Sequence, residues 1–199
     1  KEVRFDAIRG NISEIKTLAS LCGTQEKNSG NMAVSDTMDV EKITDKSDHC
    51  GKITGIDGSG RGVDADNADT VTEENLAQHI SNAKMLSKKL QTIVAITGAI
   101  DLVTDGSSCY VIRNGNPQME HVTGAGCQLS GILTAFLAAN PENKLQAAAA
   151  AVCMMGYAGE LAAEKSGQSG SGTYRVSLMD AVSCMDGDIL ERGARYEIR

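Results

Sequence analysis

The sequence contains no tryptophan, and its 199 residues include only two phenylalanines and four tyrosines. Leucine, isoleucine, valine, alanine and methionine must therefore pack the core of a chain that is 41% hydrophobic. Its length is enough for one full core or a large part of a two-layer domain. Basic residues are not in excess either: the net charge of −7 argues against a surface for nucleic acid or an anionic membrane. The longest apolar run is too short to cross a bilayer, so no membrane partner is expected.

Several chemical motifs are also missing. No G-x-x-x-x-G-K-[ST] segment is present, which excludes a P-loop, and no arrangement of Ser, His and Asp indicates a catalytic triad. The six cysteines include no C-x-x-C pair, which favours reduced thiols in a cytoplasmic protein over a zinc site or a disulfide framework. Cys109, Cys153 and Cys184 lie in apolar patterns and are expected in the core.

Hydrophobic periodicity predicts alternating helices and strands, and hence an α/β fold. Residues 92–97, TIVAIT, form a continuous apolar run typical of a strand buried on both faces. The Asp-Gly pair at 105–106 predicts a hairpin between strands at 102–104 and 109–113. A strand is predicted at 1–8 and a turn at 9–10. Helices are predicted at 11–21, at 70–91 and from about residue 127 onward. A further helix has its body at 145–164, with Asn140 as its cap and Pro141 at its first position, and a last helix at 178–185 precedes a charged tail.

Residues 23–69 differ in character, because they are rich in Gly, Ser, Asp, Asn and Lys and poor in large apolar side chains. A structureless loop of this length is unusual inside a compact domain, so we expect a mobile insertion. The chain begins with Lys and enters the predicted strand almost at once. We therefore also expect that an N-terminal part is missing.

The stretch 121–140 gives the clearest functional signal. Gly124 and Gly126 precede Cys127, and apolar residues then follow at helical spacing. Glycines let the chain bend and let a ligand approach the backbone, while the first N–H groups of a helix carry partial positive charge. This pattern predicts an anion site suited to phosphoryl transfer. The alternative is an ordinary glycine-rich turn with Cys127 as a small buried residue.

Four segments occur in a familiar order: RGNISEI (9–15), AITG (95–98), VTGAGCQLSG (122–131) and GSGTYRVSLMD (170–180). Together they resemble the hydroxyethylthiazole kinase family, which has a ribokinase-like fold. The resemblance implies one partial domain over residues 1–199, with a central, mostly parallel sheet flanked by helices. It implies transfer of the ATP γ-phosphate, with Mg²⁺, to the hydroxyl of 4-methyl-5-(2-hydroxyethyl)thiazole in thiamine biosynthesis. A homotrimer and a fusion or association with thiamine-phosphate synthase are further expectations.

The same resemblance assigns roles to residues in three of these segments. The predicted site comprises Arg9, Asn11 and Thr97 for ATP, Gly124 for the substrate, Gly126 and Cys127 for catalysis, and Glu14 for the metal ion.

Each assignment has a structural alternative. Asn11 and Glu14 have the spacing of a capping box, which contributes about 1 kcal/mol to helix stability without any catalysis, and both roles are compatible. Arg9 is either a solvated charge or a phosphate ligand, and Thr97 is either locally bonded or placed at a ligand. For Cys127, the hypothesis is that it orients the substrate hydroxyl while the anion site supplies most of the catalysis.

Two other functions compete with the thiazole kinase. One is a hydroxymethylpyrimidine, pyridoxal or sugar kinase of the same fold, which Cys127 and the GSGTY segment disfavour. The other is a non-catalytic remnant that binds nucleotide or partner subunits.

Overall fold

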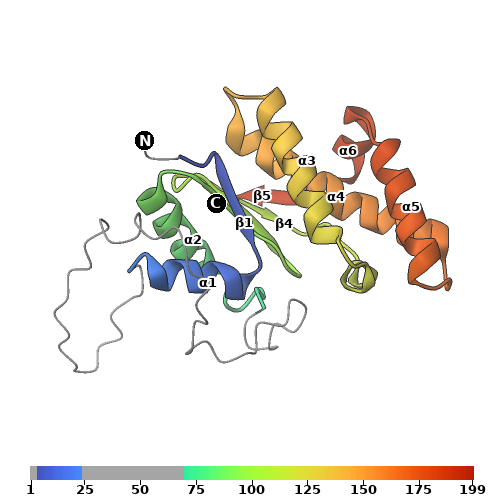
Figure 1. Ribbon diagram of the computed structural model, residues 1–199, viewed down its shortest axis with the longest axis horizontal. Coiled ribbons are helices and arrows are strands. Elements are labelled where there is room, and N and C mark those ends of the chain that lie inside the picture. The colour runs from blue at the N-terminus through green and yellow to red at the C-terminus, as the bar shows by residue number, and fades with distance from the viewer. Residues whose placement is uncertain (1–3, 24–69) are drawn as a thin grey trace, which may run out of the picture. The chain divides into compact units, whose positions relative to one another are not determined.

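The computed structural model describes residues 4–23 and 70–199, and the fold is given for these (Figure 1). Their strands form one sheet in the order β1-β2-β3-β4-β5. The strands are β1 (Ala7–Gly10), β2 (Ile93–Ile96), β3 (Asp101–Thr104), β4 (Cys109–Ile112) and β5 (Tyr196–Ile198). Apart from Gly23, the predicted insertion at 23–69 lies outside the described residues, as does the start of the predicted first strand.

The strand directions correct one expectation. β1 pairs with β2 in parallel, whereas the pairs β2–β3, β3–β4 and β4–β5 are antiparallel. The predicted α/β class and the hairpin β3–β4 are confirmed, but within the described part of the chain the sheet is not mostly parallel. The reason lies in the connections: residues 97–100 alone join β2 to β3, and a parallel pair requires a crossover of a dozen or more residues.

β1 ends two residues further along the sequence than predicted. It includes Arg9 and Gly10, for which the sequence predicts a turn. The pairing explains the difference, because Arg9 lies opposite Ala95 and Gly10 opposite Ile96 in the parallel ladder. Asn11 then caps helix α1 (Ile12–Leu21), as predicted. Its Oδ1 accepts the Glu14 N–H at 2.8 Å, and Glu14 Oε2 accepts the Asn11 N–H at 2.8 Å.

Helix α2 (Leu76–Leu90) begins six residues later than predicted. Asn75 explains this, because its side chain accepts the Thr72 N–H at 2.7 Å and donates to the Thr70 carbonyl at 3.0 Å. These two bonds hold the preceding backbone in a turn. A local side-chain bond of this kind competes with helical hydrogen bonding.

The helices of the C-terminal half differ from prediction mainly at their ends. Helix α3 (Ala125–Ala139) starts two residues before Cys127, and α4 (Lys144–Ser166) starts after residues 141–143, which were predicted to be helical. Asn140 donates to the Phe136 carbonyl at 2.9 Å, so it closes α3 instead of opening α4. The predicted helix at 178–185 is the second half of α5 (Ser171–Ser183), and the predicted charged tail contains α6 (Gly187–Gly193) and β5.

The core has two parts, one on each face of the sheet, because alternate residues of a strand point to opposite faces. On β2, Ile93 and Ala95 pack with α3, α4 and α5, whereas Val94 and Ile96 pack with α1 and α2. Figure 1 shows the same division, with α1 and α2 on one side of the sheet and α3 to α5 on the other. β2 is therefore buried on both faces, as predicted.

Helix α4 is long and apolar enough to span a bilayer by length and composition alone. However, 61% of its apolar window is buried inside the protein, where it packs against α3 and α5. Its apolar character is accounted for by its place in the core. Cys109 and Cys153 are also buried, as predicted, whereas Cys184, which was also expected in the core, is the C-cap residue of α5 and is exposed.

Candidate functional site

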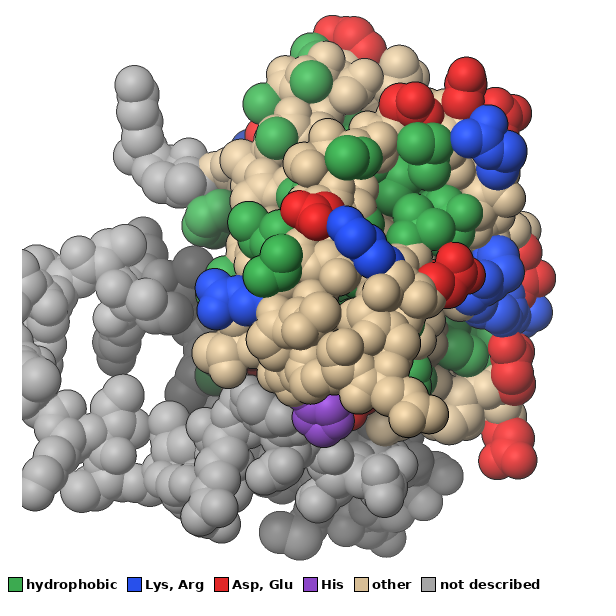
Figure 2. All heavy atoms as spheres, turned by 90° about the vertical axis from the view of Figure 1, so that its right-hand side faces the viewer, with side chains coloured by type: hydrophobic (Ala, Val, Ile, Leu, Met, Phe, Trp, Pro, Cys, Tyr) green, Lys and Arg blue, Asp and Glu red, His purple; other side chains and the backbone are tan. Residues whose placement is uncertain are grey.

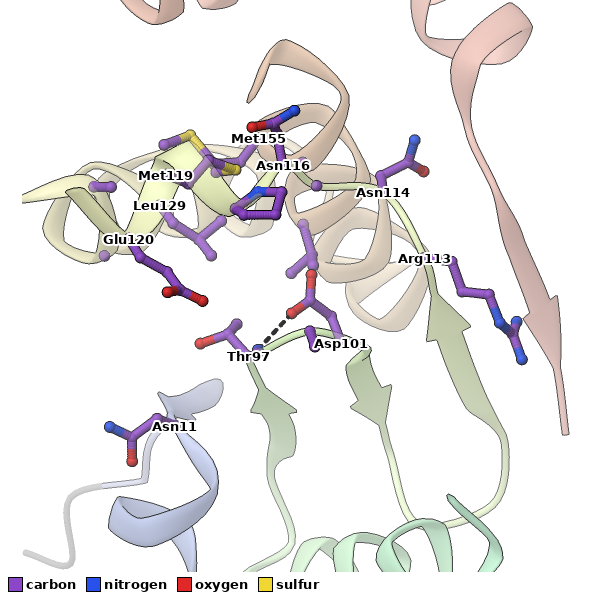
Figure 3. Close-up of a pocket in the computed structure, with 18 of the residues that line it drawn as sticks. Asn11, Thr97, Asp101, Arg113, Asn114, Asn116, Met119, Glu120, Leu129 and Met155 are labelled. Atoms are coloured by element: carbon purple, nitrogen blue, oxygen red, sulfur yellow. Dashed lines mark hydrogen bonds between the residues drawn. The ribbon is translucent and has the colours of Figure 1, made fainter. Parts of the chain in front are cut away.

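A cavity of about 390 Å³ opens at the carboxyl ends of β1 and β2 (Figure 3). Ligands of open α/β sheets bind at this edge. Five parts of the chain contribute to its wall. They are the end of β1 (Arg9, Asn11), the β2–β3 turn (Thr97, Gly98, Ala99, Asp101), the segment after β4 (Arg113, Asn114, Gly115, Asn116, Pro117, Met119, Glu120), α3 (Ala125, Gly126, Leu129) and α4 (Val152, Met155, Gly156).

The Arg9 guanidinium lies against the first turn of α3. Its Nη2 donates to Thr97 Oγ1 at 2.9 Å. A Cβ atom placed on Gly126 would lie 3.0 and 3.1 Å from the two terminal nitrogens of Arg9, so the absence of a side chain at Gly126 makes room for the guanidinium. Arg9 Nε is buried and has no hydrogen-bond partner in the described part of the chain. A cation with spare donors is therefore held at this end of the cavity.

The N-terminus of α3 adds to the positive character of this end. Gly124 has φ = 90°, a left-handed conformation that favours glycine, and it brings the chain into the helix. The Ala125 N–H donates to the Val122 carbonyl at 3.1 Å. The N–H groups of Gly126 and Cys127 follow in the first turn, where a helix offers them no carbonyl of its own. Together with Arg9, they form an arrangement suited to an anion.

Asp101 contributes a buried carboxyl group to the same cavity. Its side chain comes from the start of β3 and points into the cavity in Figure 3, and its Oδ1 accepts the Gly98 N–H at 2.8 Å. Burial raises the pKa of Asp101 to about 7, against the opposing effects of the Gly98 hydrogen bond and the Arg9 charge. The sequence analysis missed this residue. The signal that could have revealed it is an acidic residue at the start of an apolar strand, four positions after Thr97.

The opposite wall comes from residues 113–117 and from η3, a 3₁₀-helix (Pro117–His121). Asn116 caps η3, since its Oδ1 accepts the Gln118 N–H at 3.0 Å. Leu129 and Met155 form an apolar surface beside this wall, and Glu120 points toward the cavity from η3 (Figure 3). The cavity thus combines apolar walls with a few convergent polar groups, as ligand sites commonly do.

The structure brings part of the predicted site together. Four of the predicted residues line the cavity: Arg9, Asn11, Thr97 and Gly126. The other three, Gly124, Glu14 and Cys127, are not among its lining residues. Gly124 and Cys127 belong to the start of α3, Cys127 is exposed, and Glu14 is engaged with Asn11 in the capping box.

Fold and cavity together define an α/β protein with a cavity at the strand ends whose polar groups suit an anionic ligand. Comparison with known proteins narrows this class. The sequence model of the hydroxyethylthiazole kinase family matches residues 33–188. The chain belongs to this family, which confirms the resemblance inferred from the four segments.

Individual relatives agree with this assignment. A hydroxyethylthiazole kinase of Clostridium acetobutylicum is 41% identical over 198 residues, which are 99% of this chain and 60% of the relative. One of Desulfovibrio desulfuricans is 33% identical, over 99% of this chain and 59% of the relative. The chain thus spans about three fifths of the length of these curated relatives.

A solved structure is similar in fold. The hydroxyethylthiazole kinase protein from Pyrococcus horikoshii OT3 superposes with a TM-score of 0.66 and 21% sequence identity, covering 98% of this chain and 55% of that one. This likeness confirms the predicted fold class.

Proposed function

We propose that the chain carries out the ATP-dependent phosphorylation of the hydroxyl group of 4-methyl-5-(2-hydroxyethyl)thiazole, a step of thiamine biosynthesis. The observation that carries the proposal is the Arg9 guanidinium, held by Thr97 against the first turn of α3 in a cavity at the strand ends. Relatives named hydroxyethylthiazole kinase over nearly the whole of this chain supply the substrate class.

The geometry suits phosphoryl transfer because that reaction depends chiefly on positioning and on stabilising negative charge. In the proposed role, the Arg9 guanidinium binds phosphate oxygens through its free N–H donors. The Thr97 hydroxyl holds the guanidinium in place, and Asn11 lines the same cavity. Gly126 lets the guanidinium lie close to the first N–H groups of α3, so that one phosphate can bind both.

Gly124 and Cys127 are assigned to the acceptor side of the reaction. Both belong to the start of α3, and Cys127 is exposed in its first turn, so a bound alcohol can reach it. Cys127 orients the substrate hydroxyl toward the phosphate, and Gly124 gives the substrate room beside the backbone.

Mg²⁺ fits this site as an ion that the protein and the phosphates of ATP bind together, rather than as one that the protein holds alone. The described residues contain no group of three His, Cys, Asp or Glu side chains close enough to hold a metal ion. Mg²⁺ commonly takes one or two carboxylates and completes its shell with phosphates and water. Glu14 is an exposed carboxylate, and we assign it to the ion. One of its oxygens also accepts the Asn11 N–H in the capping box. When bound, Mg²⁺ neutralises charge on the phosphates.

The test is ADP release from ATP and Mg²⁺, measured with and without the thiazole alcohol. The Clostridium acetobutylicum relative serves as positive control, and hydroxymethylpyrimidine, pyridoxal and ribose are tested as competing acceptors. Turnover that depends on the thiazole alcohol is the expected result. ATP binding without turnover on any acceptor would contradict the kinase function and select the non-catalytic binding role instead. Turnover on another acceptor would identify a related kinase.

The assembly and location of the protein are further parts of the proposal. Helix α5 exposes Val176 and Met179, which are 61% and 54% accessible, and Figure 2 shows apolar side chains among charged ones on this face. Exposed apolar side chains suit a contact between copies of the chain. The assembly that we propose is a homotrimer, which light scattering after gel filtration tests. An association with thiamine-phosphate synthase is tested by co-purification. The free thiols of the described cysteines favour a cytoplasmic location.

A further inference from the structure

The cavity wall formed by residues 113–117 is held by a carboxylate that is not itself part of the wall. Glu160 of α4 accepts the Gly115 N–H at 2.8 Å and the Asn114 Nδ2–H at 3.0 Å, both through Oε1. Asn114 is 4% exposed and Gly115 lines the cavity. Glu160 therefore fixes the backbone and one side chain of this wall at the same point.

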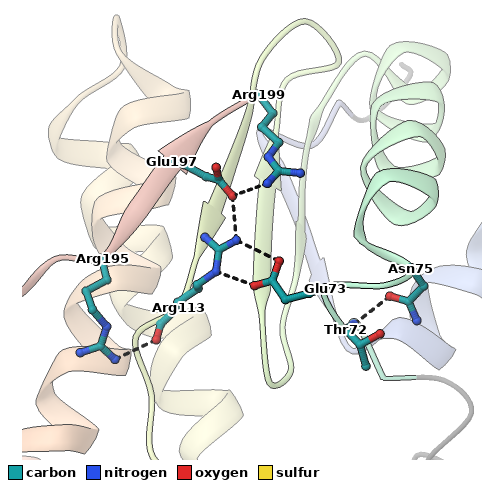
Figure 4. A network of polar contacts seen from close by, with 7 residues as sticks. All are labelled: Thr72, Glu73, Asn75, Arg113, Arg195, Glu197 and Arg199. Carbon is teal, nitrogen blue, oxygen red and sulfur yellow. Dashed lines mark hydrogen bonds and ion pairs between the residues drawn. The ribbon is translucent and has the colours of Figure 1, made fainter.

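Arg195, which directly precedes β5, completes the arrangement from the other side. Its Nη1 and Nη2 donate to the two oxygens of Glu160, each at 2.8 Å. Its backbone N–H donates to Asn114 Oδ1 at 2.7 Å. Its Nη2 also donates to the Arg113 carbonyl at 2.9 Å, and Figure 4 shows this second contact. The C-terminal strand and α4 thus hold the same short segment.

The strength of this arrangement follows from the burial of Glu160, whose side chain is 17% exposed. Its carboxylate accepts four hydrogen bonds, two of them from a guanidinium in the bidentate geometry that favours binding. Loss of the carboxylate would leave the buried Asn114 amide with only the Gly193 carbonyl, at 2.9 Å, as acceptor. It would also release the exposed Gly115 N–H to water, so the segment would lose the group that ties its backbone to α4.

Helix α4 also limits the wall sterically. A Cβ atom on Gly156 would lie 2.6 Å from the Asn114 carbonyl oxygen, so helix and wall are already in close contact. Gly115 has φ = 148°, a conformation that favours glycine, and its N–H is one of the donors to Glu160. The position of the wall is therefore fixed by contacts from α4 and from Arg195, and it has little freedom to relax.

We propose that Glu160 is a positioning residue of the nucleotide site, which sets residues 113–117 as a wall of the cavity with the help of Arg195. The identity of the ligand in this role rests on the proposed function. The hydrogen bonds by which Glu160 holds the wall do not depend on it. Glu160 itself does not contact the ligand, and it acts through Asn114 and Gly115.

The test compares Glu160→Ala and Glu160→Gln with Glu164→Ala as matched control. Glu164 is an exposed carboxylate one turn further along α4. ATP affinity is measured by calorimetry, and amide hydrogen exchange is measured on the ligand-free chains. We expect Glu160→Ala to weaken ATP binding about tenfold, and Glu160→Gln, which keeps an acceptor oxygen for Asn114 and Gly115, only about threefold. Glu164→Ala should bind as the unchanged chain does.

Hydrogen exchange keeps the test decisive where ATP is not bound, and Glu160→Gln carries the test where Glu160→Ala does not fold. The Gly115 amide should exchange faster in both Glu160 variants, and most in the alanine variant, while amides of β2 keep their protection. Folded Glu160 variants with unchanged Gly115 exchange or unchanged ATP affinity would overturn the proposal. If the unchanged chain binds no ATP while Gly115 exchange rises as expected, the proposed function fails and the holding of the wall stands.

Discussion

At the scale of single residues, Asp101 is the group whose ionisation the fold alters most directly at the site. Burial raises its pKa from the ordinary value of 3.8 to about 7. The folded chain therefore binds a proton at Asp101 between these two pH values, whereas the unfolded chain does not. It follows that this residue makes the fold less stable as the pH rises from about 4 to about 7.

The first prediction concerns Asp101→Asn, which cannot ionise and keeps an acceptor for the Gly98 N–H. The variant should gain stability over the unchanged chain, and the gain should grow by about 2–3 kcal/mol between about pH 5 and about pH 8. Urea unfolding of both chains at the two pH values measures it. A stability difference that is the same at both pH values would mean that Asp101 does not titrate as its burial implies.

The second prediction concerns Cys127, in the first turn of α3. If it orients the hydroxyl, Cys127→Ala should lower turnover by roughly tenfold to a hundredfold without abolishing it, because the anion site remains. Steady-state kinetics with the thiazole alcohol measure this effect, and circular dichroism serves as control for folding. Loss of all detectable turnover in a folded variant would refute the role. Cys127→Asp should retain turnover if the position also accepts the hydroxyl proton, and an inactive folded Asp variant would argue against that.

At the scale of elements, the contact between α4 and the segment after β4 decides the shape of the cavity. Gly156 lets the helix approach the Asn114 backbone, since a Cβ atom there would lie 2.6 Å from the carbonyl oxygen. A glycine within a helix costs roughly 1 kcal/mol relative to alanine, so this close contact must be worth more than the lost helix propensity.

The third prediction follows from that balance. Gly156→Ala should destabilise the fold by about 1–3 kcal/mol in spite of its better helix propensity, because a backbone atom must move to admit the methyl group. Gly131→Ala is the control, since a Cβ atom on Gly131 of α3 would meet no atom within 4 Å beyond its chain neighbours and the backbone of its own helix, and it should be neutral or slightly stabilising. Thermal and urea unfolding measure both. A stabilised Gly156→Ala chain would show that the contact is looser than described.

Local pattern predicted the elements well where the decisive interactions are themselves local. The buried strand β2 and the capping box of α1 were both foreseen, because their signals lie within a few residues. The starts of α2 and α4 were wrong, because Asn75 and Asn140 bind backbone groups in ways that the pattern leaves open. A cap can serve either the helix before it or the helix after it.

The C-terminal strand was missed for a different reason. Arg195, Glu197 and Arg199 alternate with apolar residues, and this alternation was interpreted as a charged tail. Its partner β4 lies far away in the sequence, and Glu197 pairs with Arg113 at 2.7 Å only once the chain has folded (Figure 4). Long-range pairing of this kind cannot be predicted from a window of neighbouring residues.

At the scale of the whole molecule, the residues of the site also divide into those that a local motif predicts and those that only long-range contacts reveal. Arg9, Thr97 and Gly126 come from three distant segments, and motif resemblance selected them before the fold placed them together. Asp101 and Glu160 carry no comparable motif. Their importance arises from burial and from contacts with other elements, so only the structure reveals them.

The molecule is acidic as a whole, with a net charge of −7, yet the proposed ligand is a polyanion. One local arrangement can offset the overall negative charge, namely Arg9 with spare donors beside the N-terminus of α3. Affinity for ATP should therefore depend strongly on this single cation rather than on the general surface charge.

Calorimetric titration of ATP with Mg²⁺ into the unchanged chain, Arg9→Ala and Arg175→Ala tests this claim most directly. Arg175 is an exposed arginine of α5 and controls for the loss of one positive charge. We expect the unchanged chain and Arg175→Ala to bind ATP with equal affinity, and a folded Arg9→Ala chain to bind it at least about tenfold more weakly. Equal ATP affinity of all three chains, or an equal loss in both variants, would contradict the role of Arg9.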